Sequence, residues 1–161
     1  MSTTTIDLAV EDGRWENAVP ALETLVTRAV EAGLAIAPDR PEGEVEVSVL
    51  LADDTTVREL NRTWRGKDKP TNVLSFPAAP QPRHAETALP LGDVVLAYET
   101  MVRESEEQGK PLQNHLVHLL VHGTLHLVGQ DHETGLAEAE AMEALEVAAL
   151  ATLGIPDPYA D

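Results

Sequence analysis

The segment from Pro111 to His132 constrains the fold more than any other part of this sequence. After Pro111, which suits the first turn of a helix, apolar residues occur on nearly every side of the predicted helix and leave hardly any polar face. Such a helix is stable only where other elements cover it on all sides. The same segment holds five of the six histidines of the chain. The sequence therefore predicts a central buried helix that carries imidazole side chains.

The periodicity of the remaining residues predicts strands and helices packed around that helix in one domain, 1–161. Alternating apolar positions predict strands at 4–10, 45–51, 72–76 and 91–98. Further helices are predicted from Asn17 to Gly33, from Asp53 past Trp64, from Glu99 to Gln108 and from about Thr134 to Leu153. In the last helix we expect Leu136 and Met142 to face inward and the glutamates outward. Residues 78–90, rich in proline, are predicted to form a flexible loop or lid.

The composition narrows the possible partners of the chain. With 28 acidic and 11 basic residues, its net charge is −17, so most of its surface should repel phosphate backbones and anionic membranes. Cysteine is absent, which excludes disulfides, thiolate chemistry and cysteine-based zinc sites. No apolar stretch reaches the ~18 residues of a membrane span, and the start lacks an export signal. We therefore expect a soluble, cytoplasmic protein.

The spacing of the histidines predicts a metal site. His122 and His126 are four residues apart on the buried helix, so their side chains lie ~40° apart around the axis and ~6 Å apart along it. Gly129 can adopt a left-handed conformation that ends the helix and returns His132 to the same ion. This frame matches the metzincin pattern H-E-x-x-H-x-x-G-x-x-H except at Gly123, which stands in place of the general base. The sequence thus predicts metal binding but does not support ordinary zinc peptidase activity.

The chemistry of three imidazole ligands favours one catalytic zinc ion per chain, because a fourth position stays open for water. Asp131 and Glu133 flank the third ligand, His132. Either carboxylate could accept a hydrogen bond from a metal-bound histidine and fix its tautomer, or could act as the general base that Gly123 does not supply. The other histidines are expected in different roles: His115 and His118 in packing or pocket lining, and His84 in solvent.

A basic segment stands out against the acidic background. It comprises Arg58, Arg62, Arg65, Lys67 and Lys69. A local patch of this size could hold one or two phosphates, although cations near a helix C-terminus are also favoured by the helix dipole. The chain has few aromatic residues, so we expect no stacking platform, and bases would be held by shape and backbone.

Three motifs resemble those of one known family. HGTLHLVGQDH (122–132) is similar to the signature of the YbeY-type endoribonucleases, bacterial rRNA maturation factors, and NRTWRGKDKPTNVLSFP (61–77) and LGDVVLA (91–97) resemble its other motifs. Gln130 and Asn72 depart from residues often seen in the family, but neither is at a ligand position. The resemblance implies an α+β, zincin-like fold with a mixed four-stranded sheet and about five helices. It also implies zinc on His122, His126 and His132.

The resemblance further implies cleavage of single-stranded RNA, in maturation of the 16S rRNA 3′ end and in ribosome quality control, with Arg65 as the functional arginine. Arg62, Lys67 and Lys69 are candidate RNA contacts. The expected partners are single-stranded rRNA and the small ribosomal subunit or its proteins, with no DNA and no membrane. Two alternatives remain: a zinc peptidase or amidohydrolase with a base from elsewhere, such as Asp131, and a ribosome-assembly factor with structural zinc. The sequence also leaves open whether water or the RNA 2′-hydroxyl is the nucleophile.

Overall fold

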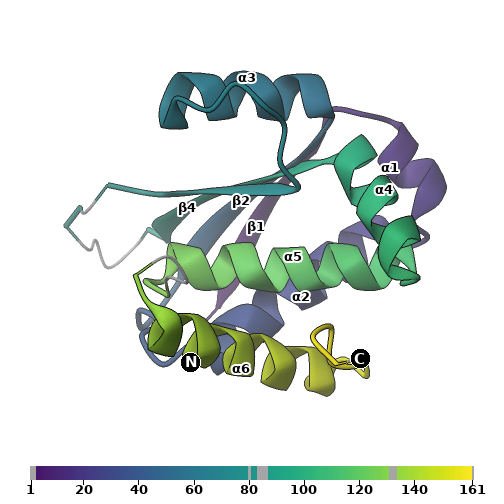
Figure 1. Ribbon diagram of the computed structural model, residues 1–161. Coiled ribbons are helices and arrows are strands. Elements are labelled where there is room, and N and C mark those ends of the chain that lie inside the picture. Colours follow the sequence, from purple (N-terminus) through teal and green to yellow (C-terminus); the bar gives the residue numbers. More distant parts are fainter. Residues whose placement is uncertain (1–2, 80, 83–86, 131–133, 161) are drawn as a thin grey trace.

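The computed structural model describes residues 3–79, 81–82, 87–130 and 134–160, and the chain forms an α+β fold within them (Figure 1). In chain order, the elements are β1 (Thr4–Val10), α1 (Arg14–Ala18), α2 (Leu22–Ile36), β2 (Val45–Ala52), α3 (Asp54–Arg65), β3 (Val73–Pro77), β4 (Leu89–Ala97), α4 (Tyr98–Gln108), α5 (Leu112–Leu127) and α6 (Leu136–Thr152). In this described part, no helix has both the length and the apolar character needed to cross a bilayer.

The four strands form one mixed sheet, as expected, and their order is β1-β2-β4-β3. β1, β2 and β4 are parallel, whereas β3 runs antiparallel to β4 at the edge of the sheet. Gly92 has a φ of +133° and lies against β3 so closely that a Cβ there would be 2.2 Å from the Phe76 carbonyl oxygen. This close approach, which only glycine allows, holds β3 against β4 at the position of Phe76.

Helices cover both faces of the sheet (Figure 1). The main core lies between one face of the sheet and the helices α2 and α5, with α6 packed on the far side of these two helices, and a smaller apolar cluster lies beneath α3 on the other face. α5 is the central buried helix that the sequence predicts, with Leu116, Leu120 and Leu125 fully buried. One side of α5 thus faces the sheet, and its other sides contact α2 and α6.

The predicted helix from Asn17 to Gly33 is wrong at both ends. A separate short helix, α1, precedes α2, and Ala21 interrupts them with a left-handed φ of 53°. Gly33 does not end α2, which continues to Ile36. Instead Gly33 lets α2 approach α5, where a Cβ would lie 3.2 Å from Thr124 Cβ. The split accounts for six helices in the described ranges where about five were expected.

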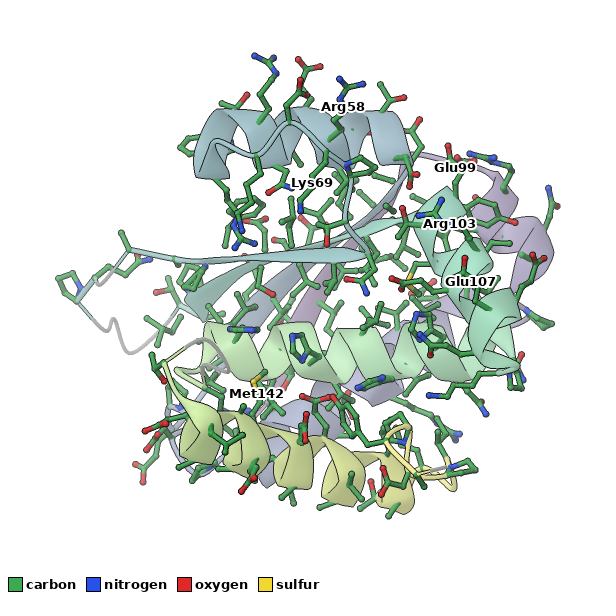
Figure 2. All side chains as sticks on the ribbon, in the orientation of Figure 1. Arg58, Lys69, Glu99, Arg103, Glu107 and Met142 are labelled. Atoms are coloured by element: carbon green, nitrogen blue, oxygen red, sulfur yellow. The ribbon has the colours of Figure 1, made fainter. Side chains whose placement is uncertain are left out.

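α6 reverses two predicted orientations. Leu136 is 76% exposed, whereas Glu146 is only 1% exposed. The buried contacts of α6 begin with Met142, which points toward α5 (Figure 2), so the first turn of the helix lies beyond the core. Glu146 tolerates burial because polar side chains from two other parts of the chain surround its carboxylate. The predicted lid falls partly on residues 80 and 83–86, which lie outside the described ranges.

Candidate functional site

The first half of the site is the pair of imidazoles on α5. The rings of His122 and His126 have centroids 4.9 Å apart and planes inclined at 74°, which confirms the proximity that their spacing predicts. Gly129 adopts the expected left-handed conformation, with a φ of +97°, just beyond the end of the helix. Its amide donates to the His126 carbonyl over 3.2 Å. The chain therefore turns back next to the two imidazoles.

Behind the imidazole pair lies a buried carboxylate from α6. Glu146 Oε2 accepts from His122 Nδ1 over 3.0 Å, and Oε1 accepts from His118 Nε2 over 2.5 Å and from the Tyr159 hydroxyl over 2.5 Å. Burial raises the pKa of Glu146, but the hydrogen bonds from the two histidines and the tyrosine outweigh it and set the pKa to about 2. Glu146 is therefore an anion at neutral pH.

The ionised state of Glu146 fixes the tautomer of His122. A carboxylate can only accept hydrogen bonds, so His122 Nδ1 carries a hydrogen atom and donates a hydrogen bond to Glu146. In the neutral ring, the lone pair then lies on Nε2. Metal-bound histidines commonly donate their second ring nitrogen to a carboxylate in this way, which orients the ring and makes it a stronger ligand.

Glu146 is not among the site residues predicted from the sequence, since all glutamates of α6 were expected on the outer face. A signal was present: Glu146 falls one helical turn after Met142 and one before Leu150, both fully buried. A glutamate in line with two core residues is expected to be buried only if it has partners. The two residues proposed for this role from the sequence, Asp131 and Glu133, lie outside the described residues.

The donor set fits a zinc ion as far as the structure describes it. Two imidazoles on adjacent turns of a helix, one of them hydrogen-bonded to a carboxylate, are typical of zinc ligands. Within the described ranges, no three His, Asp or Glu side chains lie close enough together to hold a metal ion. The third predicted ligand, His132, falls outside those ranges.

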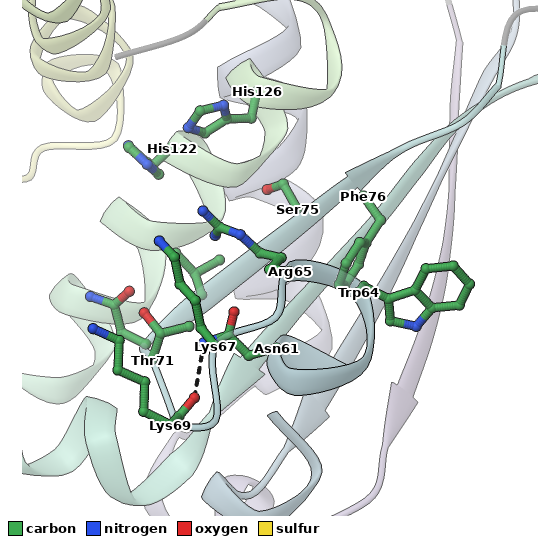
Figure 3. Close-up of a pocket in the computed structure, with 12 residues that line it drawn as sticks. Asn61, Trp64, Arg65, Lys67, Lys69, Thr71, Ser75, Phe76, His122 and His126 are labelled. Carbon is green, nitrogen blue, oxygen red and sulfur yellow. Dashed lines mark hydrogen bonds between the residues drawn. The ribbon is translucent and has the colours of Figure 1, made fainter. Parts of the chain in front are cut away.

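The second half of the site comes from the end of α3 and the loop that follows it. Gly66 ends the helix in a left-handed conformation with a φ of +71°. The buried Asn61 donates from Nδ2 to the Lys69 carbonyl over 2.9 Å, which ties the loop back to the helix. In Figure 3, the side chains of Arg65 and Lys67 extend toward the side of the pocket where the histidines lie. The loop thus presents cations to the imidazole pair.

The two halves enclose one pocket of about 580 Å³ beside the edge strand β3. Its described lining consists of Asn61, Trp64, Arg65, Lys67, Lys69, Thr71, Asn72, Val73, Ser75, Phe76, His122 and His126. Ser75 Oγ donates to the Gly123 carbonyl over 3.1 Å and joins β3 to α5. A Cβ on residue 123 would lie 2.7 Å from Val94 Cγ1, so glycine permits this close contact. Gly123 stands where the metzincin pattern has its glutamate, and the packing of α5 against Val94 requires glycine at this position.

The basic segment divides between two surfaces. Arg65, Lys67 and Lys69 line the pocket, whereas Arg58 and Arg62 line a separate shallow cavity. There Arg58 pairs with Asp68 over 2.8 Å and Arg62 with Glu59 over 2.7 Å. Figure 2 shows Arg58 on the outer side of α3. Arg62, a candidate RNA contact from the sequence, is therefore placed apart from the other three.

The expectation that the few aromatic residues leave the cationic site without an aromatic side is wrong. Trp64 is 70% exposed and lines the pocket together with Phe76 (Figure 3). A small number of aromatic residues suffices when two of them reach one pocket. Trp64 is not part of the smaller apolar cluster beneath α3, whereas Phe76 packs against that cluster.

His115 and His118 have the packing or pocket-lining roles that the sequence suggests. His115 is buried and bonds through Nε2 to Glu104 Oε1 over 2.9 Å, and His115 and His118 both line a second cavity of about 210 Å³. Burial lowers the pKa of His115, and the hydrogen bond to Glu104 only partly opposes this. His84 lies outside the described residues.

Comparison with known proteins gives consistent results. A model of the family "Endoribonuclease YbeY" matches residues 9–154. A protein named endoribonuclease YbeY from Rhodopseudomonas palustris is 56% identical over 143 residues, which cover 86% of this chain and 81% of the relative. Another of that name from a Bradyrhizobium species is 50% identical over 160 residues, covering 98% and 93%. A solution structure from Thermotoga maritima shares the fold, with a TM-score of 0.57 and 23% identity over 98% of this chain and 97% of that one.

Proposed function

This chain belongs to the YbeY family of endoribonucleases, and we propose that it is a zinc-dependent enzyme that cleaves single-stranded RNA. We propose further that it acts in the cytoplasm, in maturation of the 16S rRNA 3′ end and in ribosome quality control. One observation carries the proposal: the imidazole pair His122 and His126 and the cations Arg65, Lys67 and Lys69 line the same pocket. That combination suits a phosphodiester better than a peptide bond.

The proposed roles follow from the chemistry of the individual side chains. His122 and His126, together with His132, would hold the zinc ion, and Glu146 orients the His122 ring from behind. When bound, zinc supplies Lewis acidity that activates a nucleophile and polarises the phosphate. Arg65 offers a planar guanidinium that can hold two phosphate oxygens, and it stabilises the negative charge that grows on them in the transition state.

The charge of the rest of the molecule supports this placement of the substrate. The net charge is −17, so most of the surface repels RNA and favours its binding at the cationic pocket. The same acidic surface is complementary to basic proteins, which fits docking on proteins of the small ribosomal subunit.

Cleavage of matched substrates tests the proposal. Purified protein is incubated with a single-stranded RNA, with the same RNA annealed to its complement, and with precursor 16S rRNA. We expect cleavage of the unpaired RNA and of the precursor near its 3′ end, little cleavage of the duplex, and none by His126→Ala. Product ends that carry a 2′,3′-cyclic phosphate would identify the 2′-hydroxyl as the nucleophile. Cleavage of an unstructured peptide but not of RNA would favour a zinc peptidase, and an inactive protein that still binds zinc would favour an assembly factor.

A further inference from the structure

The most exposed aromatic side chain at the pocket is that of Trp64 in the last turn of α3. The indole is 70% exposed, whereas the only other tryptophan, Trp15, is fully buried and donates its Nε1–H to the Ala52 carbonyl over 2.9 Å. An indole in water leaves a large apolar surface hydrated, which costs free energy unless a partner covers it. The position of Trp64 at a charged pocket suggests what that partner is.

The pocket has an aromatic side and a cationic side. Trp64 and Phe76 come from α3 and β3 and lie on the same side of the pocket in Figure 3. Arg65 follows Trp64 directly in the helix, and its side chain extends toward the imidazoles (Figure 3). Consecutive residues of α3 thus present a ring and a guanidinium to one cavity of about 580 Å³. A ligand that fills both sides must carry a flat apolar face and a negative charge.

We propose that Trp64, assisted by Phe76, stacks an unpaired RNA base next to the phosphate that Arg65 and Lys67 hold. A nucleotide has the required combination of a flat ring and an anionic group, and the cations of the pocket make it a better match than an aromatic peptide. The inference rests on the proposed function and deepens it by naming a determinant of substrate specificity. In a duplex, both faces of a base are already stacked, so only an unpaired strand can supply a base to the indole.

The buried position of Trp15 gives a direct spectroscopic test. Because Trp15 is inaccessible, a change in tryptophan emission on ligand binding reports on Trp64. The probes are a short 2′-O-methyl single strand and an abasic chain of the same length with the same 2′-O-methyl sugars, and both are checked to be intact after the measurement. We expect the base-bearing strand to quench the emission and the abasic chain to bind with little quenching. Quenching that persists in Trp64→Phe would overturn the assignment of the signal and, with it, the proposal.

Binding by matched variants separates stacking from charge. We expect Trp64→Ala to weaken binding of the base-bearing strand roughly 5- to 150-fold, which corresponds to the loss of one stacked base, and to leave binding of the abasic chain unchanged. Trp64→Phe should retain most of the affinity, whereas Trp64→Leu, which is apolar but has no ring, should behave as Trp64→Ala. Arg65→Ala should weaken both probes. In cleavage, Trp64→Ala should raise KM more than it lowers kcat.

The outcomes distinguish this proposal from the function on which it rests. If the wild type cleaves single-stranded RNA and Trp64→Ala binds both probes as the wild type does, the stacking role is refuted and the proposed function stands. Equal loss of both probes would also refute stacking, because it would indicate a structural role of the indole. If the wild type neither binds nor cleaves single-stranded RNA, the proposed function fails and the stacking role fails with it.

Discussion

Replacement of Glu146 by alanine should weaken both the fold and the proposed zinc site. The substitution removes the acceptor of three hydrogen bonds, from His118, His122 and Tyr159, and each bond to an ionised group contributes ~1.5–3 kcal/mol. The side chains of His118 and His122 are 12% and 19% exposed, so water can replace part of what is lost. We therefore expect the free energy of unfolding to fall by about 2–4 kcal/mol, near the lower range for breaking a buried charged pair.

The same change should be visible in melting and in zinc binding. In a domain of this size, 1 kcal/mol shifts Tm by about 2–4 °C, so Glu146→Ala should lower Tm by roughly 5–15 °C. Loss of the carboxylate behind His122 should weaken zinc affinity about 10- to 100-fold, measured by competition with a chromophoric chelator. Glu140→Ala, an exposed glutamate of the same helix, is the control and should change neither value.

The isosteric variant Glu146→Gln sharpens the test. His122 approaches one carboxylate oxygen, and His118 and Tyr159 approach the other, all as donors. An amide offers only one oxygen acceptor, so its NH₂ group must face a donor on one side. We expect a smaller loss of stability than in Glu146→Ala but a clear loss of zinc affinity. Wild-type melting and wild-type zinc affinity in both variants would refute the orienting role of Glu146.

Three further predictions concern the pocket and its surroundings. Arg65→Ala should keep the fold and the zinc content but lower the rate of RNA cleavage, Arg65→Lys should recover part of that rate, and Arg65→Glu should cleave more slowly than Arg65→Ala. The control is Arg58→Ala, because Arg58 lies on the outer side of α3. Full activity of Arg65→Glu would contradict the role of Arg65 in holding phosphate. Gly123→Ala should lower the free energy of unfolding in denaturant by about 1–3 kcal/mol, since its Cβ would lie 2.7 Å from Val94 Cγ1. Gly123→Glu should not raise the rate of RNA cleavage. A faster Gly123→Glu enzyme would show that the wild type lacks an effective general base. Because burial lowers the pKa of His115 in the folded protein, the unfolded chain binds the proton first as pH falls below ~6.5, and stability is lost on acidification. Between pH 7 and pH 5, the Tm of His115→Gln should therefore fall less than the Tm of the wild type. Parallel plots of Tm against pH for the two proteins would contradict this contribution of His115.

The parts of the site that follow from local spacing could be predicted from the sequence. The i, i+4 histidines come together because helix geometry alone fixes their separation, and the left-handed Gly129 follows from the same reasoning. The spacing of Glu146 from Met142 and Leu150 indicates that it is buried, but its hydrogen bonds could not be derived in that way, because its partners His118 and Tyr159 come from other parts of the chain. The separation of Arg62 from Arg65 likewise depends on which side of α3 faces the pocket. Tertiary packing decides such cases, and periodicity cannot.

The central claim is that one pocket binds both a zinc ion and the phosphate of the RNA that is cleaved. Titration of zinc into metal-free protein tests this claim most directly. Metal is removed with a chelator, zinc is returned in steps, and cleavage of a single-stranded RNA is measured at each step alongside bound zinc. We predict that the stripped protein is inactive and that activity rises in proportion to bound zinc up to one ion per chain. His122→Ala should bind little zinc and stay inactive. Full activity of the stripped protein, or no zinc bound at saturation, would contradict the account.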